Sequence, residues 1–401
     1  MIDQRFQTAK GILDRLEAYH HKAYFVGGAI RDLLLDRTTG DIDIATSASP
    51  QQVQQLFDKV IPVGIEHGTV VVRFEGESFE VTTFRVEGAY SDYRHPDHVH
   101  FVDQIEEDLA RRDFTINAIA MDKAGDLVDP FSGQRDLNQQ MIRTVGDPEQ
   151  RFSEDPLRML RALRFSSQLG FTLEPNTYAA LKENIEWIEK IAIERITTEL
   201  EKMFAGTYSG YAMKMFVKAN VAEYVPLLAK SNRLLKFLEV LDRPLHSLTE
   251  VIAAFSVIEP SISNEQWAKQ WKLSNQTKNH AKQLSDAIQQ CDKTGLDKWL
   301  VYQLDKHLHA SLVRITQILS RKQTINLENI KMLYQQLPIH TRQDLAINGH
   351  DLISLFPKRN KGPWMKQLLR EIEYQVVVGN VNNTKQAIGE WVKKWNPPET
   401  N

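Results

Sequence analysis

The pattern of apolar and polar positions changes from strand-like to helix-like along this chain. Apolar residues 23–26 predict a strand, and strict alternation over residues 41–45 predicts a half-buried strand whose two aspartates share one face. A short helix is expected between them, at residues 30–35. Two hairpins are expected further along, one joining residues 69–74 to 78–83 and the other joining 118–121 to 127–129.

After Gly146 the strand pattern nearly disappears, and helical spacing interrupted by prolines continues to the end of the chain. Before that point, residues 87–100 are rich in Tyr, Asp, Arg, His and Pro, show no clear period and predict a mobile loop. The sequence therefore predicts a part with mixed strands and helices up to about residue 145, followed by a long helical part.

The overall composition excludes several classes of protein. The 401 residues are 42% hydrophobic and 25% charged, which is ordinary for a globular protein of two to four domains. Neither a membrane span nor the apolar stretch of a signal peptide is expected. The single cysteine excludes an internal disulfide and a cysteine-based metal site, and we expect a cytoplasmic protein. A formal net charge of −3 leaves room for a local basic patch but not for a basic surface all round.

The first cluster of candidate chemistry begins with Gly27 and Gly28, just before the helix that carries Arg31. Glycines let a phosphate approach the backbone, and their N–H groups can form an anion-binding nest. On the next strand, Asp41 and Asp43 repel each other unless a cation lies between them, and their oxygens suit Mg²⁺. The cluster therefore predicts phosphoryl transfer from a nucleotide with metal ions at these aspartates. The alternative is a strand edge that the aspartates protect from aggregation.

A further carboxylate, Glu80, lies in the middle of the expected strand 78–83. It is predicted to face the same metal ions or to orient the hydroxyl group that attacks the nucleotide. The alternative is a strand residue that faces solvent.

The second cluster is residues 111–117, Arg-Arg-Asp-Phe-Thr-Ile-Asn. The forked guanidinium of Arg112 suits phosphate, and the Asn117 amide beside Asp113 suits the hydroxyl groups of a ribose. The alternative, which is compatible with the first, is a helix that begins at Asp113 with salt-bridged arginines.

The third cluster is residues 154–165, in which Pro156 suits the first turn of a helix. Asp155, Arg158 and Arg161 then share one face of that helix, and Arg164 follows three residues later. The alternative is a plain ladder of salt bridges between residues three apart.

An adjacent carboxylate and guanidinium would select bases by their hydrogen-bonding edges. Cytosine and adenine both present an amino donor beside an unprotonated ring nitrogen, whereas uracil and guanine present a carbonyl beside a ring N–H. Asp155 only accepts and Arg158 only donates, so the pair matches the first two bases and rejects the others. The pair therefore predicts a protein template for CTP and ATP.

The three clusters together resemble those of the bacterial, class II tRNA nucleotidyltransferases, the CCA-adding enzymes, and the resemblance covers essentially the whole chain. Residues 23–48 resemble the metal motif of that family, residues 111–117 its ribose motif and residues 154–164 its EDxxR template motif. Arg195 and Glu199 match a further motif that steadies the template helix.

The resemblance implies a seahorse-shaped protein with an α+β, polymerase-β-like nucleotidyltransferase head followed by an all-α neck, body and tail. The implied boundaries are 1–145 for the head, 146–205 for the base-reading neck, 206–285 for the body and 286–401 for the tRNA-binding tail. The implied activity is the addition of C, C and A to the 3′ end of tRNA from CTP and ATP, with Mg²⁺ and release of pyrophosphate. No membrane is implied, and no protein partner is identifiable.

The resemblance also implies a role for individual residues. Asp41 and Asp43 would hold the metal ions, and Glu80 would assist as the third catalytic residue. Residues 91–96 resemble a loop that acts as a lever when specificity changes from CTP to ATP. The implied nucleotide-binding residues are Gly28, Arg31, Arg112, Asp113, Asn117, Asp155, Arg158, Arg161 and Arg164.

Near the C-terminus, basic and aromatic side chains interleave, a composition that can meet phosphates and exposed bases of RNA. The alternative is a solvated helix face with its tryptophans in the core. The expected tRNA-binding residues are Lys358, Arg359, Lys361 and Lys366.

Three other functions compete with CCA addition. A bacterial poly(A) polymerase shares the head and template motifs. A tRNA nucleotidyltransferase that adds only CC or only A is the second alternative. The third is a catalytically inactive RNA-binding protein, which the intact Asp41 and Asp43 disfavour.

Overall fold

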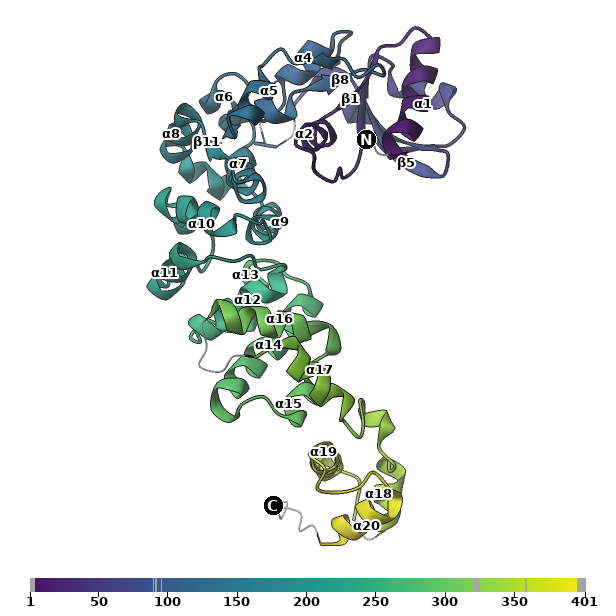
Figure 1. Cartoon of the computed structure of the whole chain (residues 1–401), viewed down its shortest axis with the longest axis vertical. Coiled ribbons are helices and arrows are strands. Elements are labelled where there is room, and N and C mark those ends of the chain that lie inside the picture. Colours follow the sequence, from purple (N-terminus) through teal and green to yellow (C-terminus); the bar gives the residue numbers. More distant parts are fainter. Residues whose placement is uncertain are drawn as a thin grey trace. The chain divides into compact units, whose positions relative to one another are not determined.

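The computed structural model describes residues 4–88, 90, 92–94, 96–319, 325–357 and 359–394. Two compact units divide the chain, Met1–Pro244 and Leu245–Asn401. In Figure 1, the first unit runs in colour from purple to teal and contains the large sheet, and the second runs from green to yellow. An α+β head followed by helices confirms the predicted fold class.

The head contains a seven-stranded mixed sheet in the order β3-β4-β5-β2-β1-β8-β9. β2 and β5 are parallel, and the other neighbouring pairs are antiparallel. One core cluster joins Val26 and Ala45 of the sheet to Leu109 of α4 (Ile105–Ala110). The strands of the sheet are β1 (Ala23–Val26), β2 (Asp43–Thr46), β3 (Val60–Gly64), β4 (Thr69–Phe74), β5 (Glu77–Thr83), β8 (Ala120–Met121) and β9 (Leu127–Val128).

The strand that carries the catalytic candidates begins at Asp43, so the prediction of a strand from residue 41 was wrong by two residues. β1 ends at Val26, opposite Asp43, because Gly27 turns the chain with φ +74° into α2 (Gly28–Leu34). No residue of β1 is therefore left to pair with Asp41. Parallel pairing with β5 sets Asp43 directly beside Glu80.

The segment expected to be a loop at residues 87–100 carries regular structure at both ends. β6 (Arg85–Glu87) pairs with β7 (Val99–Phe101), and both strands are too short for an alternating pattern to be visible in the sequence. A second two-stranded pair, β10 (Met141–Ile142) with β11 (Thr172–Leu173), was also not predicted.

Some helices of the first unit, among them α1 and α3, pack against the sheet, whereas α7 packs against α9 and α10. α7 begins directly after Pro156, as predicted, and the N–H of Leu157 donates to Asp155 Oδ1 at 3.0 Å. The helix ends at Gly170, which has φ +77°. Besides α2 and α4, the helices are α1 (Gln4–Ala18), α3 (Pro50–Leu56), α5 (Gly133–Asn138), α6 (Pro148–Glu154), α7 (Leu157–Leu169), α8 (Pro175–Glu183), α9 (Ile193–Phe204), α10 (Ser209–Lys218) and α11 (Asn232–Val240).

The second unit is helical throughout its described residues. Phe255, Trp267 and Trp271 form an aromatic cluster in its core. Among the described helices of the whole chain, none combines the length and apolar character needed to cross a membrane. The α-helices are α12 (Leu248–Ile258), α13 (Asn264–Gln270), α14 (Asn275–Thr294), α15 (Lys298–Gln303), α16 (His309–Ile318), α17 (Leu327–Gln335), α18 (Gly349–Leu355), α19 (Pro363–Val377) and α20 (Lys385–Lys393).

Candidate active site

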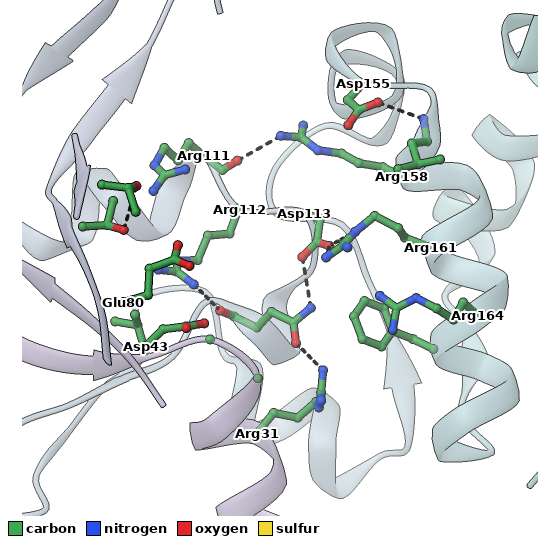
Figure 2. Close-up of a pocket in the computed structure, with 18 of the residues that line it drawn as sticks. Arg31, Asp43, Glu80, Arg111, Arg112, Asp113, Asp155, Arg158, Arg161 and Arg164 are labelled. Atoms are coloured by element: carbon green, nitrogen blue, oxygen red, sulfur yellow. Dashed lines mark hydrogen bonds and ion pairs between the residues drawn. The ribbon is translucent and has the colours of Figure 1, made fainter. Parts of the chain in front are cut away.

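A cavity of about 570 Å³ in the first unit gathers most of the predicted site residues. Figure 2 shows side chains from the sheet on one side and from α7 on the other pointing into it. Arginines outnumber carboxylates in its lining, so it suits an anion. Its charged lining residues are Arg31, Arg85, Arg111, Arg112, Arg158, Arg161, Arg164, Arg195, Asp43, Glu80, Asp113 and Asp155.

Asp43 and Glu80 form the acidic corner of the cavity. Residues paired across neighbouring strands point to the same face, so the two carboxylates lie side by side on the sheet. Burial and the neighbouring Glu80 raise the pKa of Asp43 to about 6, although Arg112 acts in the opposite direction. Asp43 is half-buried and Glu80 is exposed, as the alternative for Glu80 required. Two neighbouring carboxylates of which one has a raised pKa form an environment that a divalent cation would relieve.

Asp41 lies outside the cavity lining. Its side chain is 100% exposed, with one carboxylate oxygen 3.9 Å from Arg5 Nη2. Its negative charge still contributes to the raised pKa of Asp43. The structure therefore brings Asp43 and Glu80 together and leaves Asp41 at the edge of the same region.

Gly27 and Arg112 shape the floor of the cavity. A side chain at position 27 would bring its Cβ within 3.1 Å of Arg112 Nη1 and 3.6 Å of Asp43 Oδ2, and φ +74° also favours glycine there. Arg112 donates through Nη2 to Asp108 at 3.2 Å, whereas its buried Nε has no partner in the described part of the protein. An unpaired buried donor in a cationic cavity is suited to an anionic ligand.

A chain of hydrogen bonds connects α7 to α2 across the cavity, as Figure 2 shows. Arg161 Nε donates to Asp113 at 2.8 Å, the Asn117 amide donates to Asp113 at 3.0 Å, and Arg31 donates to the Asn117 oxygen at 2.8 Å. Arg31 also pairs with Asp32 at 2.9 Å. Burial raises the pKa of Asp113, but Arg161 and the amide outweigh burial and hold this pKa far below its usual value.

Both predicted base-reading residues line the cavity, but they are not bonded to each other. Asp155 Oδ2 accepts a hydrogen bond from Arg195 at 2.7 Å. Arg158, which is 8% exposed, donates to the backbone oxygens of Arg151 at 3.1 Å and Arg111 at 3.2 Å, and pairs with Glu154. Each member of the pair is thus held by its own partners.

The salt-bridge ladder considered as an alternative is present only in part, because Glu154 pairs with Arg151 and Arg158, whereas the next two arginines of α7 have distant partners. Arg161 reaches Asp113, and Arg164 pairs with Glu199 of α9. Arg164 also lies over the ring of Phe165, with 3.8 Å from Cζ to the ring centroid. Arg195 donates to Asp155 and Glu199 pairs with Arg164. Both contacts fit the expected role of these residues in steadying α7, the helix that carries the template motif.

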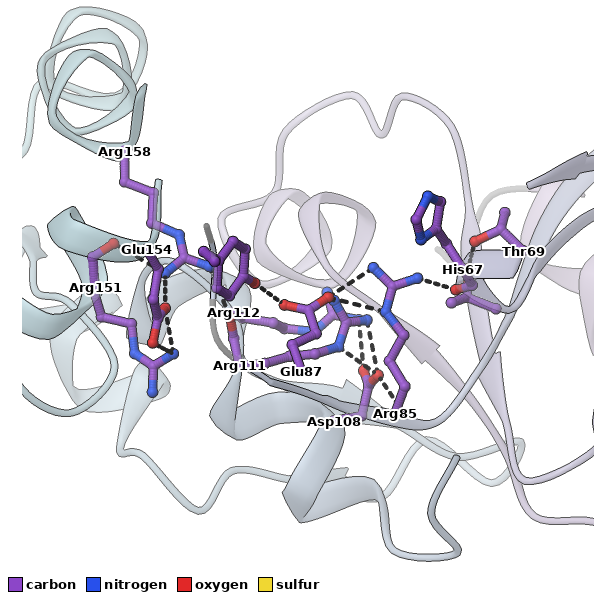
Figure 3. A network of polar contacts seen from close by, with 12 residues as sticks. His67, Thr69, Arg85, Glu87, Asp108, Arg111, Arg112, Arg151, Glu154 and Arg158 are labelled. Carbon is purple, nitrogen blue, oxygen red and sulfur yellow. Dashed lines mark hydrogen bonds and ion pairs between the residues drawn. The ribbon is translucent and has the colours of Figure 1, made fainter. Parts of the chain in front are cut away.

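Three residues that the sequence analysis did not single out form ion pairs that hold Arg111 or one another, and Figure 3 shows this network. They are Arg85, Glu87 and Asp108. Glu87 accepts from Arg85 at 2.8 Å and from Arg111 at 3.0 Å, and Asp108 accepts from Arg111 at 2.8 Å. The spacing of Asp108 before two arginines, at i+3 and i+4 on a helix, was a usable signal for one of these contacts. Arg85 and Glu87 pair at i and i+2 within β6, whereas the contact of Glu87 with Arg111 joins residues 24 positions apart and leaves no pattern in the sequence.

Of the expected lever loop at residues 91–96, the structure describes residues 92–94 and 96, whereas Ser91 and His95 lie outside the described residues. Lys190, in the 3-10 helix Ile185–Lys190, lies over the ring of Tyr93, 4.0 Å from its centroid. A second cavity of about 410 Å³ reaches from this loop to Glu80 and Arg158.

The expected tRNA-binding residues belong to the second unit. Lys361 and Lys366 are exposed, and Arg359 lies over the ring of Trp364 at 4.7 Å. Trp364 is buried, as the alternative interpretation of this segment required. Lys358 lies outside the described residues.

Three family models match consecutive parts of the chain. The Poly A polymerase head domain matches residues 23–143, the RNA and SrmB-binding site of polymerase A matches residues 170–231, and tRNA nucleotidyltransferase domain 2 matches residues 244–392.

Two relatives and one solved structure align with the chain over nearly its full length, and all three are CCA-adding enzymes. A CCA-adding enzyme of Oceanobacillus iheyensis is 45% identical over 402 residues, covering 100% of both chains. A CCA-adding enzyme of Bacillus cereus is 40% identical over 98% of this chain and 99% of the relative. The crystal structure of the Bacillus stearothermophilus CCA-adding enzyme in complex with CTP matches with a TM-score of 0.87 and 36% identity, covering 98% of both chains.

Proposed function

Because this chain belongs to the family of CCA-adding enzymes, which are tRNA nucleotidyltransferases, we propose that it adds C, C and A in turn to the 3′ end of tRNA, using CTP and ATP. The observation that carries the proposal is one cavity that combines a carboxylate pair with an acceptor-only and a donor-only side chain. The carboxylate pair, Asp43 and Glu80, suits nucleotidyl transfer. Asp155, which only accepts, and Arg158, which only donates, suit the hydrogen-bonding edge that cytosine and adenine share.

The triphosphate would occupy the arginine-rich part of the cavity near Gly28. Arg112 is the strongest candidate for direct contact, because it lines the cavity beside Gly27 and its Nε has no partner among the described residues. Arg31 is already held by Asp32 and Asn117, so it would present a fixed positive charge. Fixed charges of this kind stabilise a transferring phosphoryl group without reorganising during the reaction.

Asp43 would hold Mg²⁺ with Glu80 beside it, and Asp41 would join them by turning its exposed side chain from Arg5 towards the cavity. Hard oxygen donors and the raised pKa of Asp43 both fit a divalent cation. The bound metal would supply charge stabilisation for the attacking and leaving oxygens. Glu80 would orient the 3′ hydroxyl of the RNA towards the nucleotide from the same face of the sheet.

Asp113 and Asn117 would place the ribose, and Arg161 would fix the carboxylate of Asp113. Asp155 and Arg158 would read the base edge. Arg195 and the N–H of Leu157 fix the orientation of the Asp155 carboxylate, because both donate to it. Arg164 would support the same helix through Glu199.

The tRNA partner would contact Arg359, Lys361 and Lys366, with Lys358, in the second unit. Two of these lysines are exposed and free to approach phosphates. We also propose the division into head (1–145), neck (146–205), body (206–285) and tail (286–401), and the location of the whole seven-stranded sheet before residue 129 supports the extent of the head. Its substrates, tRNA and nucleoside triphosphates, make the cytoplasm the expected location.

Incubation of tRNA lacking its 3′ CCA with labelled CTP or ATP and Mg²⁺ tests the proposal. We expect two C residues and then one A, with incorporation abolished in Asp43→Asn. A long A ladder would instead indicate the poly(A) polymerase activity that the name of the matched head model raises. Addition of only CC or only A would indicate the specialised relatives, and tight RNA binding without incorporation would exclude an enzyme.

A further inference from the structure

Two histidines and an aspartate converge in the second unit, far along the chain from the proposed active site. His280 lies in α14, which packs against α16. His307 lies in a 3-10 helix (Lys306–Leu308) between α15 and α16, and Asp305 directly precedes that helix. One possible ligand atom from each of the three lies within 4.8 Å of those of the other two.

The two imidazoles already have the separation of two ligands of one ion. His280 Nδ1 lies 3.4 Å from His307 Nε2, and the ring centroids are 4.6 Å apart. A tetrahedral ion with nitrogen ligands at about 2.0–2.1 Å holds those nitrogens about 3.3 Å apart. The carboxylate of Asp305 lies 3.8 Å from the other nitrogen of His280 and is half exposed, so it can turn towards the same ion.

The donor set determines the class of ion. Two imidazole nitrogens and one carboxylate oxygen suit zinc and neighbouring transition metals, whereas Mg²⁺ prefers oxygen ligands alone. The positive charge of the neighbouring Lys306 side chain does not occupy the site, because its ammonium group lies over the ring of Tyr334, 5.3 Å from the centroid. The alternative without metal is one N–H···N hydrogen bond between the two rings.

We propose that His280, Asp305 and His307 bind a divalent transition metal ion, with zinc as the expected occupant. The ion would connect α14 to the segment before α16 and thereby stabilise the second unit by mass action. This structural site is separate in chain position and in ligand chemistry from the proposed Mg²⁺ site of the first unit.

Zinc titration of the full-length protein by calorimetry tests the proposal, with excess Mg²⁺ present to occupy oxygen-only sites. We expect one zinc per chain and an affinity at least about tenfold weaker in His280→Asn, His307→Asn and Asp305→Asn. The matched control is His350→Asn, which removes an exposed histidine of the same unit and should bind zinc like the wild type.

A measurement on the unmodified protein keeps the test independent of any variant. Co²⁺ added in the presence of Mg²⁺ should give the intense visible absorption of a tetrahedral nitrogen-containing site, and zinc should displace it. Equal zinc affinity in the wild type and His280→Asn would overturn the proposal, as would a weak octahedral Co²⁺ spectrum. Unchanged binding in Asp305→Asn alone would overturn the assignment of three ligands.

Discussion

Replacing Asp155 by asparagine is the sharpest test of base selection, because it changes one acceptor and keeps the shape. Both oxygens of Asp155 accept protein hydrogen bonds, from Leu157 N–H at 3.0 Å and from Arg195 at 2.7 Å. An asparagine amide has only one oxygen, so its NH₂ group must face one of these donors. The variant therefore loses one of the two contacts that orient the group and offers a donor to the base.

The expected size of the effect follows from the charge on the group. A hydrogen bond to a charged group contributes about 1.5–3 kcal/mol, and each 1.4 kcal/mol corresponds to about tenfold in a rate ratio. We therefore expect kcat/KM for CTP to fall roughly 10- to 150-fold in Asp155→Asn. The ratio of kcat/KM for CTP to that for UTP should also fall, because the new NH₂ group can donate to the uracil carbonyl.

Single-turnover incorporation into tRNA lacking CCA, measured with each of the four nucleotides, gives both quantities. Asp58→Asn is the matched control, since it makes the same change of charge at an exposed position of the head. Circular dichroism verifies that each variant is folded. A CTP-to-UTP ratio equal to that of the wild type, in a folded Asp155→Asn protein, would refute the template argument.

Four further outcomes are expected. Arg158→Ala should let UTP and GTP compete in the same assay, and unchanged selectivity would contradict its role. Asp41→Ala should abolish incorporation with tRNA affinity preserved in filter binding, so normal turnover would remove it from the metal site. Because the folded pKa of Asp43 is raised to about 6, the group favours folding below pH 4 and loses that contribution as pH rises through 6; Mg²⁺ binding at pH 6 should therefore release about half a proton per ion, detectable by calorimetry in two buffers. Glu199→Ala should lower the free energy of unfolding by about 3–5 kcal/mol, because Arg164 is left as an unpaired buried charge, and a urea titration showing less than 1 kcal/mol would contradict this.

The parts of the fold that follow local rules were predictable from the sequence. The strand at residues 23–26 has the predicted bounds, and α7 begins after Pro156, because burial patterns and the restricted φ of proline act over a few residues. The start of β2 was not predictable, since it depends on where β1 ends, at a glycine 16 residues before Asp43. β6 and β7 were missed because three-residue strands carry too little pattern.

For the site, the sequence identified the residue types and the structure supplied their partners. Spacing along α7 predicted that its charged residues share one face but did not reveal their partners, and Arg161 pairs with a residue 48 positions away. Arg158 is oriented by a backbone oxygen 47 positions away, which no side-chain pattern can reveal. Selectivity between bases needs donors and acceptors held in fixed directions, because a freely rotating guanidinium or carboxylate would adapt to the wrong base. If Asp155 and Arg158 read the base as proposed, base selection depends on the head and on α9 as much as on α7. A change at Arg195 should then alter base choice without removing a group that contacts the base.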